Sequence, residues 1–214
     1  RQMCIRDSHY TLDGSEPTAA SPRYTGPVEI GKSARFRATA LREGGENASY
    51  SREFAFSKST GRPAVLNTKP NDSYTFEGAS LLVDGYHSRP VFTSGAWLGY
   101  LDEPLDVTID MGGEQSYRSV ELETLAEKGD WIFPPSSVTV WVSDNGTDFT
   151  EVASVAVPEA KAGDADGIGR YRMQFPETSA RYLKVVAQNA AAIPAWHPGA
   201  GSKGFLFVDE VVVE

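Results

Sequence analysis

Short runs in which apolar and polar residues alternate constrain the fold of this chain more than any other feature. The clearest is LDVTIDM at 105–111, whose period of two places every apolar side chain on one face of a strand. Similar strand-like runs occur at 64–67, 119–124, 137–143, 149–157, 171–175, 181–187 and 205–213. No long segment shows the 3.6-residue period of an amphipathic helix. The sequence therefore predicts an all-β protein with little helix.

The bulk composition narrows the classes of function. The 214 residues suffice for one or two domains, and 40% of them are hydrophobic, which is enough for ordinary cores. The formal net charge of −9 disfavours nucleic acid and anionic membranes as partners, because an acidic surface repels phosphate. No apolar run of about 18 residues is present, so no membrane insertion is expected. The single cysteine, Cys4, cannot form an internal disulfide.

The first 57 residues are interpreted as part of a small β-sandwich. Residues 1–8, RQMCIRDS, resemble a translated sequencing-adaptor remnant, and the alternative is a frayed native terminus. The later segments YTLDGSEPT, SPRYTGPVEI and ARFRATA resemble the immunoglobulin-like domain near the C-terminus of chitobiases and β-hexosaminidases. Such a sandwich usually has about seven strands, whereas four or five are expected here, including 27–30 and 34–40. We therefore expect a truncated immunoglobulin-like domain at 1–57.

The remainder of the chain carries a second set of motifs. The segment 82–112 begins with the turn LVDG, has a tryptophan about a dozen residues on, and ends in the strand-like run that closes with Asp-Met-Gly. VSDNGTDFTEV, ARYLKV and a closing Asp-Glu-Val strand follow in order. This series resembles the coagulation factor 5/8 type C (discoidin) domain, whose fold also serves as the family 32 carbohydrate-binding modules of bacterial glycosidases. The resemblance implies a galactose-binding-like β-sandwich jelly roll over 58–214.

Two stretches give a closer resemblance. GDWIFPPSSVTVWVSDNGTDFTEV and PAWHPGAGSKGFLFVDEVVV resemble the C-terminal discoidin-like domain of bacterial family 20 glycoside hydrolases, the β-N-acetylhexosaminidases. The resemblance implies an exported parent enzyme (periplasmic, cell-surface or extracellular) whose catalytic barrel lies before residue 1. That barrel is then the expected partner within the same chain, and residues 1–214 alone are expected to be monomeric.

Catalytic signatures are missing from the sequence. Glycoside hydrolysis needs two carboxylates facing one cleft, and no spacing singles out such a pair. The sequence has no G-x-S-x-G elbow, P-loop or H-E-x-x-H. His9, His87 and His197 lie far apart, and no Cys/His cluster suggests zinc. We expect the chain itself not to be an enzyme.

The resemblance implies one structural calcium ion where the Asp-Gly loop meets the closing strand. Asp84 and Glu210 map onto the positions that supply side-chain oxygens. Ser88 is a third candidate, although the usual Ser or Thr lies one residue further on, at Arg89. Calcium takes six to eight oxygens, many of them backbone carbonyls. The alternative is that Asp84 caps a turn and that Glu210 pairs with a basic residue.

Tryptophans outside the strands are the candidates for carbohydrate binding. An indole face packs against the C–H face of a pyranose, while a few polar groups bind the hydroxyls. Trp131 and Trp196 lie in Gly- and Pro-flanked connections, and the connections of a β-sandwich gather at its ends. With His197 as the polar group and Tyr100 as a further contact, they are predicted to bind glycans of the galactose or N-acetylhexosamine type.

Alternatives remain for each tryptophan. Trp97 aligns with the buried tryptophan of the family and is expected in the core. Trp141 lies within the strand-like run 137–143, on the face opposite the valines, where a loop or the neighbouring domain could cover it. Trp131 and Trp196 could instead plug the end of the sandwich, in which case the domain would be a structural module that packs against the catalytic barrel and binds no glycan.

Overall fold

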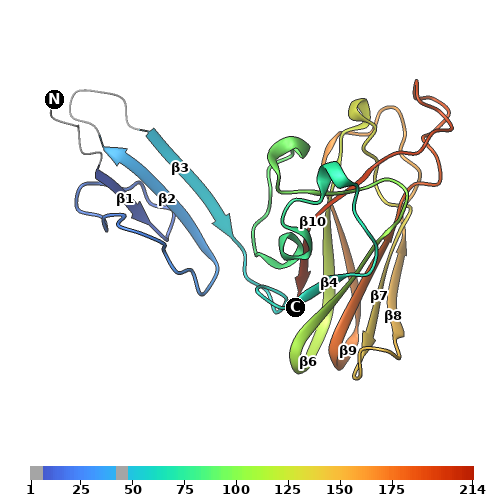
Figure 1. Cartoon of the computed structure of the whole chain (residues 1–214), viewed down its shortest axis with the longest axis horizontal. Coiled ribbons are helices and arrows are strands. Elements are labelled where there is room, and N and C mark those ends of the chain that lie inside the picture. Colours follow the sequence, from blue (N-terminus) through green and yellow to red (C-terminus); the bar gives the residue numbers. More distant parts are fainter. Residues whose placement is uncertain (1–6, 42–47) are drawn as a thin grey trace. The chain divides into compact units, whose positions relative to one another are not determined.

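The computed structural model describes residues 7–41 and 48–214 and divides into two compact units, Arg1–Phe56 and Ser57–Glu214 (Figure 1). This division lies one residue before the boundary that the sequence predicts. The interpretation of residues 1–6 and of Cys4 as foreign sequence lies outside the described residues.

In residues 7–41 and 48–56, the first unit forms one antiparallel sheet of three strands, with the order β1 (Asp7–Thr11), β2 (Ala34–Leu41) and β3 (Ala48–Phe54). The expected strand at 27–30 is wrong, because these residues pair with no described strand. Their side chains still alternate between exposed and half-buried, which explains the period in the sequence. Pro27, which lacks an N–H donor, begins the segment.

The second unit is built from a seven-stranded sheet that folds over on itself. Its pairing order is β5-β10-β6-β9-β7-β8, and β4 pairs with the first half of β6. The strands are β4 (Ala64–Leu66), β5 (Leu98–Tyr100), β6 (Leu105–Ala126), β7 (Ser137–Ser143), β8 (Thr150–Ala156), β9 (Gly167–Gln188) and β10 (Leu206–Val213). This discoidin-like β-sandwich confirms the predicted fold class.

Helix is scarce, as the sequence predicts. The described residues contain four short 3₁₀ helices: η1 (Asp72–Tyr74), η2 (Gly78–Val83), η3 (Phe92–Ser94) and η4 (Lys128–Asp130). None of the helices in the described part of the chain has the length and hydropathy that a membrane span requires.

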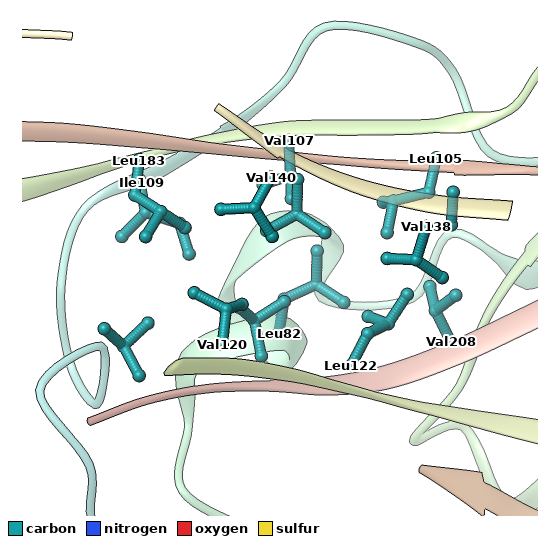
Figure 2. Close-up of a cluster of buried hydrophobic side chains, with 14 of the residues drawn as sticks. Leu82, Leu105, Val107, Ile109, Val120, Leu122, Val138, Val140, Leu183 and Val208 are labelled. Atoms are coloured by element: carbon teal, nitrogen blue, oxygen red, sulfur yellow. The ribbon is translucent and has the colours of Figure 1, made fainter. Parts of the chain in front are cut away.

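The two longest strands, β6 and β9, replace four strands that the sequence predicts separately. Each has 22 residues, and they pair with each other on both sides of a register shift at Asp110/Gln115. Gly112, with φ of 79°, lies within this irregularity, where a left-handed backbone favours glycine. The bend brings the apolar faces of the two halves together, so Leu105 and Ile109 lie across the core from Val120 and Leu122 (Figure 2).

Candidate functional site

Three connections meet at one end of the second unit: 127–136 after β6, 157–166 before β9 and 189–205 before β10. The first and third are joined by the hydrogen bonds Phe133 N–H to Phe205 O (2.9 Å) and Phe205 N–H to Trp131 O (2.8 Å). The second is held to the first by Asp166, which accepts the backbone N–H of Lys128 at 3.1 Å and pairs with its ammonium group. These contacts join the three connections, which are distant in sequence, into one structural unit that we call the frame.

Trp131 lies at the centre of this frame in a strained conformation. Its φ of 65° and ψ of 25° are left-handed, which costs a residue with a Cβ roughly 1–2 kcal/mol. Trp131 nevertheless stays 43% exposed, so a large part of its ring remains at the surface. Gly199 makes the arrangement possible, because a Cβ there would lie 2.8 Å from Cζ2 of the indole.

Trp196 is the second exposed indole at this end. Its side chain is 40% exposed, and its Nε1–H donates to Ala160 O at 2.9 Å. In contrast, Trp97 is fully buried, as expected, and donates its Nε1–H to Arg89 O. Trp131 and Trp196 are therefore surface groups with fixed orientations, and the structure does not bury them as plugs.

His197 lies edge-on to both indoles but is not available to a ligand. Its ring centroid is 6.1 Å from that of Trp131 and 5.6 Å from that of Trp196, at interplanar angles of 87° and 83°. Nε2 donates to Lys128 O at 2.9 Å, and Nδ1 accepts the N–H of Gly199 at 3.0 Å. The predicted role in binding hydroxyls is therefore corrected: this buried histidine positions the tryptophans.

Tyr100 is also removed from the predicted set. It is the last residue of β5, where it pairs with Leu206 of β10, and its side chain is fully buried in the core. A strand of only three residues carries too little periodicity to be recognised in the sequence, so nothing in the sequence indicated that Tyr100 lies in a strand.

A groove of about 360 Å³ beside Trp196 was not foreseen. Ala160, which accepts the indole hydrogen bond, and Ala195, which precedes Trp196, both line it. The only signal in the sequence is the small, apolar composition of NAAAIPA at 189–195. The remaining walls are formed by Phe133, Pro134, Pro135, Ser136, Val157, Pro158, Glu159, Ala190, Ala191, Ala192, Ile193 and Pro194.

The predicted metal-binding residues lie elsewhere, where η2 meets β10. Glu210 is fully buried, and both of its carboxylate oxygens lie 3.3 Å from the N–H of Gly85. Asp84 Oδ1 accepts the N–H of Tyr86 at 2.7 Å. Ser88 is buried nearby but contacts a different carboxylate.

That carboxylate is Asp209, which sequence reasoning missed. It accepts the N–H of Ser88 at 2.7 Å and its hydroxyl at 3.2 Å. Consecutive residues of a regular strand point to opposite faces, so a regular strand would bury only one of Asp209 and Glu210. The register shift between Val208 and Val211 breaks this alternation, and Asp209 and Glu210 are both buried.

The carboxyl groups of Asp209 and Glu210 are buried without a positively charged partner among the described residues. Burial disfavours the charged form of a carboxyl group. Burial therefore raises the pKa of Asp209 and the pKa of Glu210, and the negative charge of Asp84 raises both pKa values further. No basic side chain in 7–41 or 48–214 forms an ion pair with Asp209 or Glu210, contrary to the alternative for Glu210. Buried charges need a partner or a proton.

The donors at this cluster fit calcium only if backbone oxygens contribute. Within the described ranges, no three His, Cys, Asp or Glu side chains form a group that could hold a metal ion. All the side-chain donors are oxygens, which suit a hard cation, and calcium sites commonly include backbone carbonyls.

The fold and the strand order define the second unit as a discoidin-like β-sandwich, and family comparisons agree. Residues 67–203 match the family model described as F5/8 type C domain, and residues 6–54 match one described as Fn3 associated. The first match covers more than half of the 214 residues. The chain therefore belongs to the F5/8 type C domain family. A comparison with curated proteins found no match.

Several solved structures are similar to the chain at low sequence identity. CpGH89CBM32-5 from Clostridium perfringens, in complex with GalNAc-β-1,3-galactose, is 16% identical, with 71% of this chain and 93% of that chain covered and a TM-score of 0.47. Chitosan-binding module 1 of a chitosanase/glucanase from Paenibacillus sp. IK-5 is 19% identical (74% and 98% covered, TM-score 0.48). The C-terminal domain of a chitobiase from Bacteroides fragilis is 15% identical (73% and 95% covered, TM-score 0.45).

Proposed function

We propose that the second unit is a non-catalytic carbohydrate-binding module whose ligand contacts Trp131 and Trp196. The observation that carries this proposal is their exposure on a rigid frame. Large aromatic side chains usually contribute to stability by burial, yet here a left-handed backbone and a buried histidine hold two indoles at the surface. An indole face offers the apolar platform on which a pyranose ring stacks.

Of the two predicted ligand types, galactose and N-acetylhexosamine, the adjoining groove favours the N-acetylhexosamine. Its walls are mainly Ala and Pro side chains, which suit an acetyl methyl group better than a charged substituent. With His197 and Tyr100 excluded, the exposed carboxylate of Glu159 is the side chain in this groove best placed to accept hydroxyl hydrogens. Stacking contributes about 1 kcal/mol per ring beyond area burial, so a single module should bind weakly.

We further propose that the chain is the accessory region of an exported bacterial β-N-acetylhexosaminidase. The support is the resemblance of sequence motifs in both units to that enzyme class. This resemblance points to one class of enzyme, whereas the family matches identify only the types of domain. Weak binding to a glycan surface would raise the local concentration of substrate around an attached catalytic domain.

A structural calcium ion is also proposed, held by Asp84, Glu210 and Asp209 with backbone carbonyls. The support is the set of buried oxygen donors without a basic partner for Asp209 and Glu210. The ion would neutralise the buried carboxylates and fix the loop after η2 to β10. It would take no part in binding sugar directly.

Substitution of the two tryptophans tests the carbohydrate site. In isothermal titration with N-acetylglucosamine and galactose oligosaccharides, Trp131→Ala and Trp196→Ala should each remove the binding that the loop-end site contributes. The unfolding free energy should change by about 1 kcal/mol or less, whereas a buried plug would cost about 3–5 kcal/mol. Tyr24→Ala, which removes a comparably exposed ring from the first unit, is the matched control. Unchanged binding in both variants would exclude the loop end as the glycan site. No binding of any of these sugars to the unsubstituted chain would favour the alternative, a structural module without a glycan ligand.

A further inference from the structure

A second aromatic surface lies on the outer face of the sheet, away from the end that carries Trp131. In β7 the side chains of Val140 and Val142 are buried in the core, so Trp141 between them faces outward. Strand pairing places Lys184 of β9 on one side of Trp141 and Glu151 of β8 on the other.

This outer face is hollowed around Trp141. The hollow measures about 450 Å³, which falls in the range of about 300–1,000 Å³ that is usual for small-ligand sites. It shares no lining residue with the groove beside Trp196. Its walls come from β6, β7, β9 and the turn before β8, and they comprise Asp106, Thr139, Trp141, Thr147, Phe149, Lys184, Val186 and Gln188.

The side chains in the hollow retain unused hydrogen-bonding capacity. No described residue accepts a hydrogen bond from the indole N–H of Trp141. The ammonium group of Lys184 lies 4.3 Å from the ring centroid of Phe149 and forms no ion pair in the described part of the chain. Asp106 uses Oδ1 to accept from Asn67 at 2.7 Å, which leaves Oδ2 as an acceptor.

The hollow contains both a negative charge, on Asp106, and a positive charge, on Lys184, and this combination restricts the kind of ligand that can bind. An anion would be repelled by Asp106, and a cation by Lys184. An apolar protein surface would desolvate both groups without pairing them, which is costly. A sugar hydroxyl both donates and accepts, so neighbouring hydroxyls of one ring can satisfy the carboxylate and the ammonium while the ring stacks on the indole.

We propose that the hollow around Trp141 is a second carbohydrate-binding site, which takes a neutral pyranose ring independently of Trp131 and Trp196. The module then has one site at its loop end and one on its sheet face. Two weak sites on one rigid body bind a polysaccharide more tightly than either alone, because the second contact is intramolecular.

The four tryptophans make this proposal directly testable. In a ¹⁵N-correlated NMR spectrum each indole N–H gives one signal, and single substitutions assign them. The full chain carrying both Trp131→Ala and Trp196→Ala is titrated with chitohexaose, galactotetraose and xylohexaose up to roughly 10 mM, where a site of millimolar Kd is largely filled. We expect at least one sugar to shift the Trp141 signal saturably while the signal of buried Trp97 stays fixed.

A Trp141 signal that no sugar in the panel moves would overturn the proposal. The full chain with Trp141→Thr, a β-branched residue that suits a strand, gives an independent readout. With its Trp97 signal unchanged, that variant should retain binding at Trp131 and Trp196 and lose at least tenfold in affinity for a long neutral polysaccharide. An unchanged polysaccharide affinity would also overturn the proposal. If instead the Trp131 and Trp196 signals of the unsubstituted chain stay fixed and Trp141 moves, the loop-end site fails and the sheet-face site stands.

Discussion

Gly199 shows how one small residue can set the shape of the proposed loop-end site. A Cβ at this position would lie 2.8 Å from Cζ2 and 3.0 Å from Cη2 of Trp131. Gly199→Ala should therefore tilt the indole and weaken sugar binding about tenfold, which is about 1.4 kcal/mol. Gly129→Ala, in the same connection as Trp131 but with nothing within 4 Å of the added Cβ, is the control. Equal affinities of the two variants by isothermal titration would contradict this role for Gly199.

Asp110 gives the second unit a defined sensitivity to acid. Both of its oxygens accept hydrogen bonds from Arg181 (2.9 and 2.8 Å), and these lower its pKa from 3.8 to about 2 with help from the N–H of Gly112. Because the folded-state pKa is depressed, the pair stabilises the fold above about pH 4 and loses that effect as the pH falls towards 2. The side chain is 27% exposed, so solvent screening limits the effect to about 1 kcal/mol.

Asp110→Asn should remove this part of the acid dependence. Asparagine still offers an oxygen to Gly112 but no charge to Arg181. Urea unfolding at several pH values measures the effect, and all four tryptophans lie in the second unit, so their fluorescence reports on that unit alone. A variant that loses as much stability as the unsubstituted chain between about pH 4 and pH 2 would exclude this ion pair as the cause.

At the scale of elements, the junction of η2 and β10 should respond to calcium. A ligand that binds only the folded state stabilises it, by about 2.7 kcal/mol at a hundredfold excess over Kd. A chelator should therefore lower the melting temperature of the second unit, and Asp84→Ala should abolish that difference. Asp164→Ala, in the Asp-rich loop before β9, should leave it intact. Identical melting curves with and without chelator, in protein free of other metals, would exclude the ion.

The strands show where sequence periodicity is informative and where it is not. Alternation identified β7, both halves of β9 and the first half of β6, because each buries one face. It also identified β2 and the second half of β6, although polar side chains such as Thr39 and Glu123 are buried there as well. It could not show that Gly112 lies within one continuous strand, since a bulge and a loop both favour glycine. It also failed at 27–30, where alternation exists without a partner strand.

The sequence predicted some features of the candidate sites but not others. The exposure of Trp131 and Trp196 followed from their place in connections. The burial of His197 depends on Lys128 and Gly199, which no local pattern associates with it. Asp209 was hidden for a comparable reason, because the bulge that buries it is fixed by pairing with β6.

At the scale of the whole molecule, the two units should differ in stability. In the first, β1–β3 form a single sheet on which Tyr10, Phe36 and Tyr50 make a row of ring contacts, and Tyr50 remains 54% exposed. Both clusters of buried apolar side chains found in the described residues lie in the second unit. A single sheet without a large core is marginally stable.

Hydrogen exchange on the full chain should show this difference. Amides of β2 should exchange by local opening, orders of magnitude faster than those at the centres of β6 and β9. The strands β1 and β8 each lie at the edge of their sheet, so the exchange rates of their amides compare the two units at equivalent positions. Protection in β2 equal to that in β9 would contradict the prediction.

The pairing of β10 with β6 also fixes which features lie at each end of the second unit. Lys58 N–H donates to Val213 O at 3.0 Å, so the entry and the exit of this unit lie side by side. Val213 pairs with Val120, whereas Phe207 pairs with Leu125 close to Trp131. The strand between them spans roughly 20 Å at 3.3–3.4 Å per residue. The chain therefore enters and leaves this unit at the end of the sandwich opposite the one that carries Trp131 and Trp196.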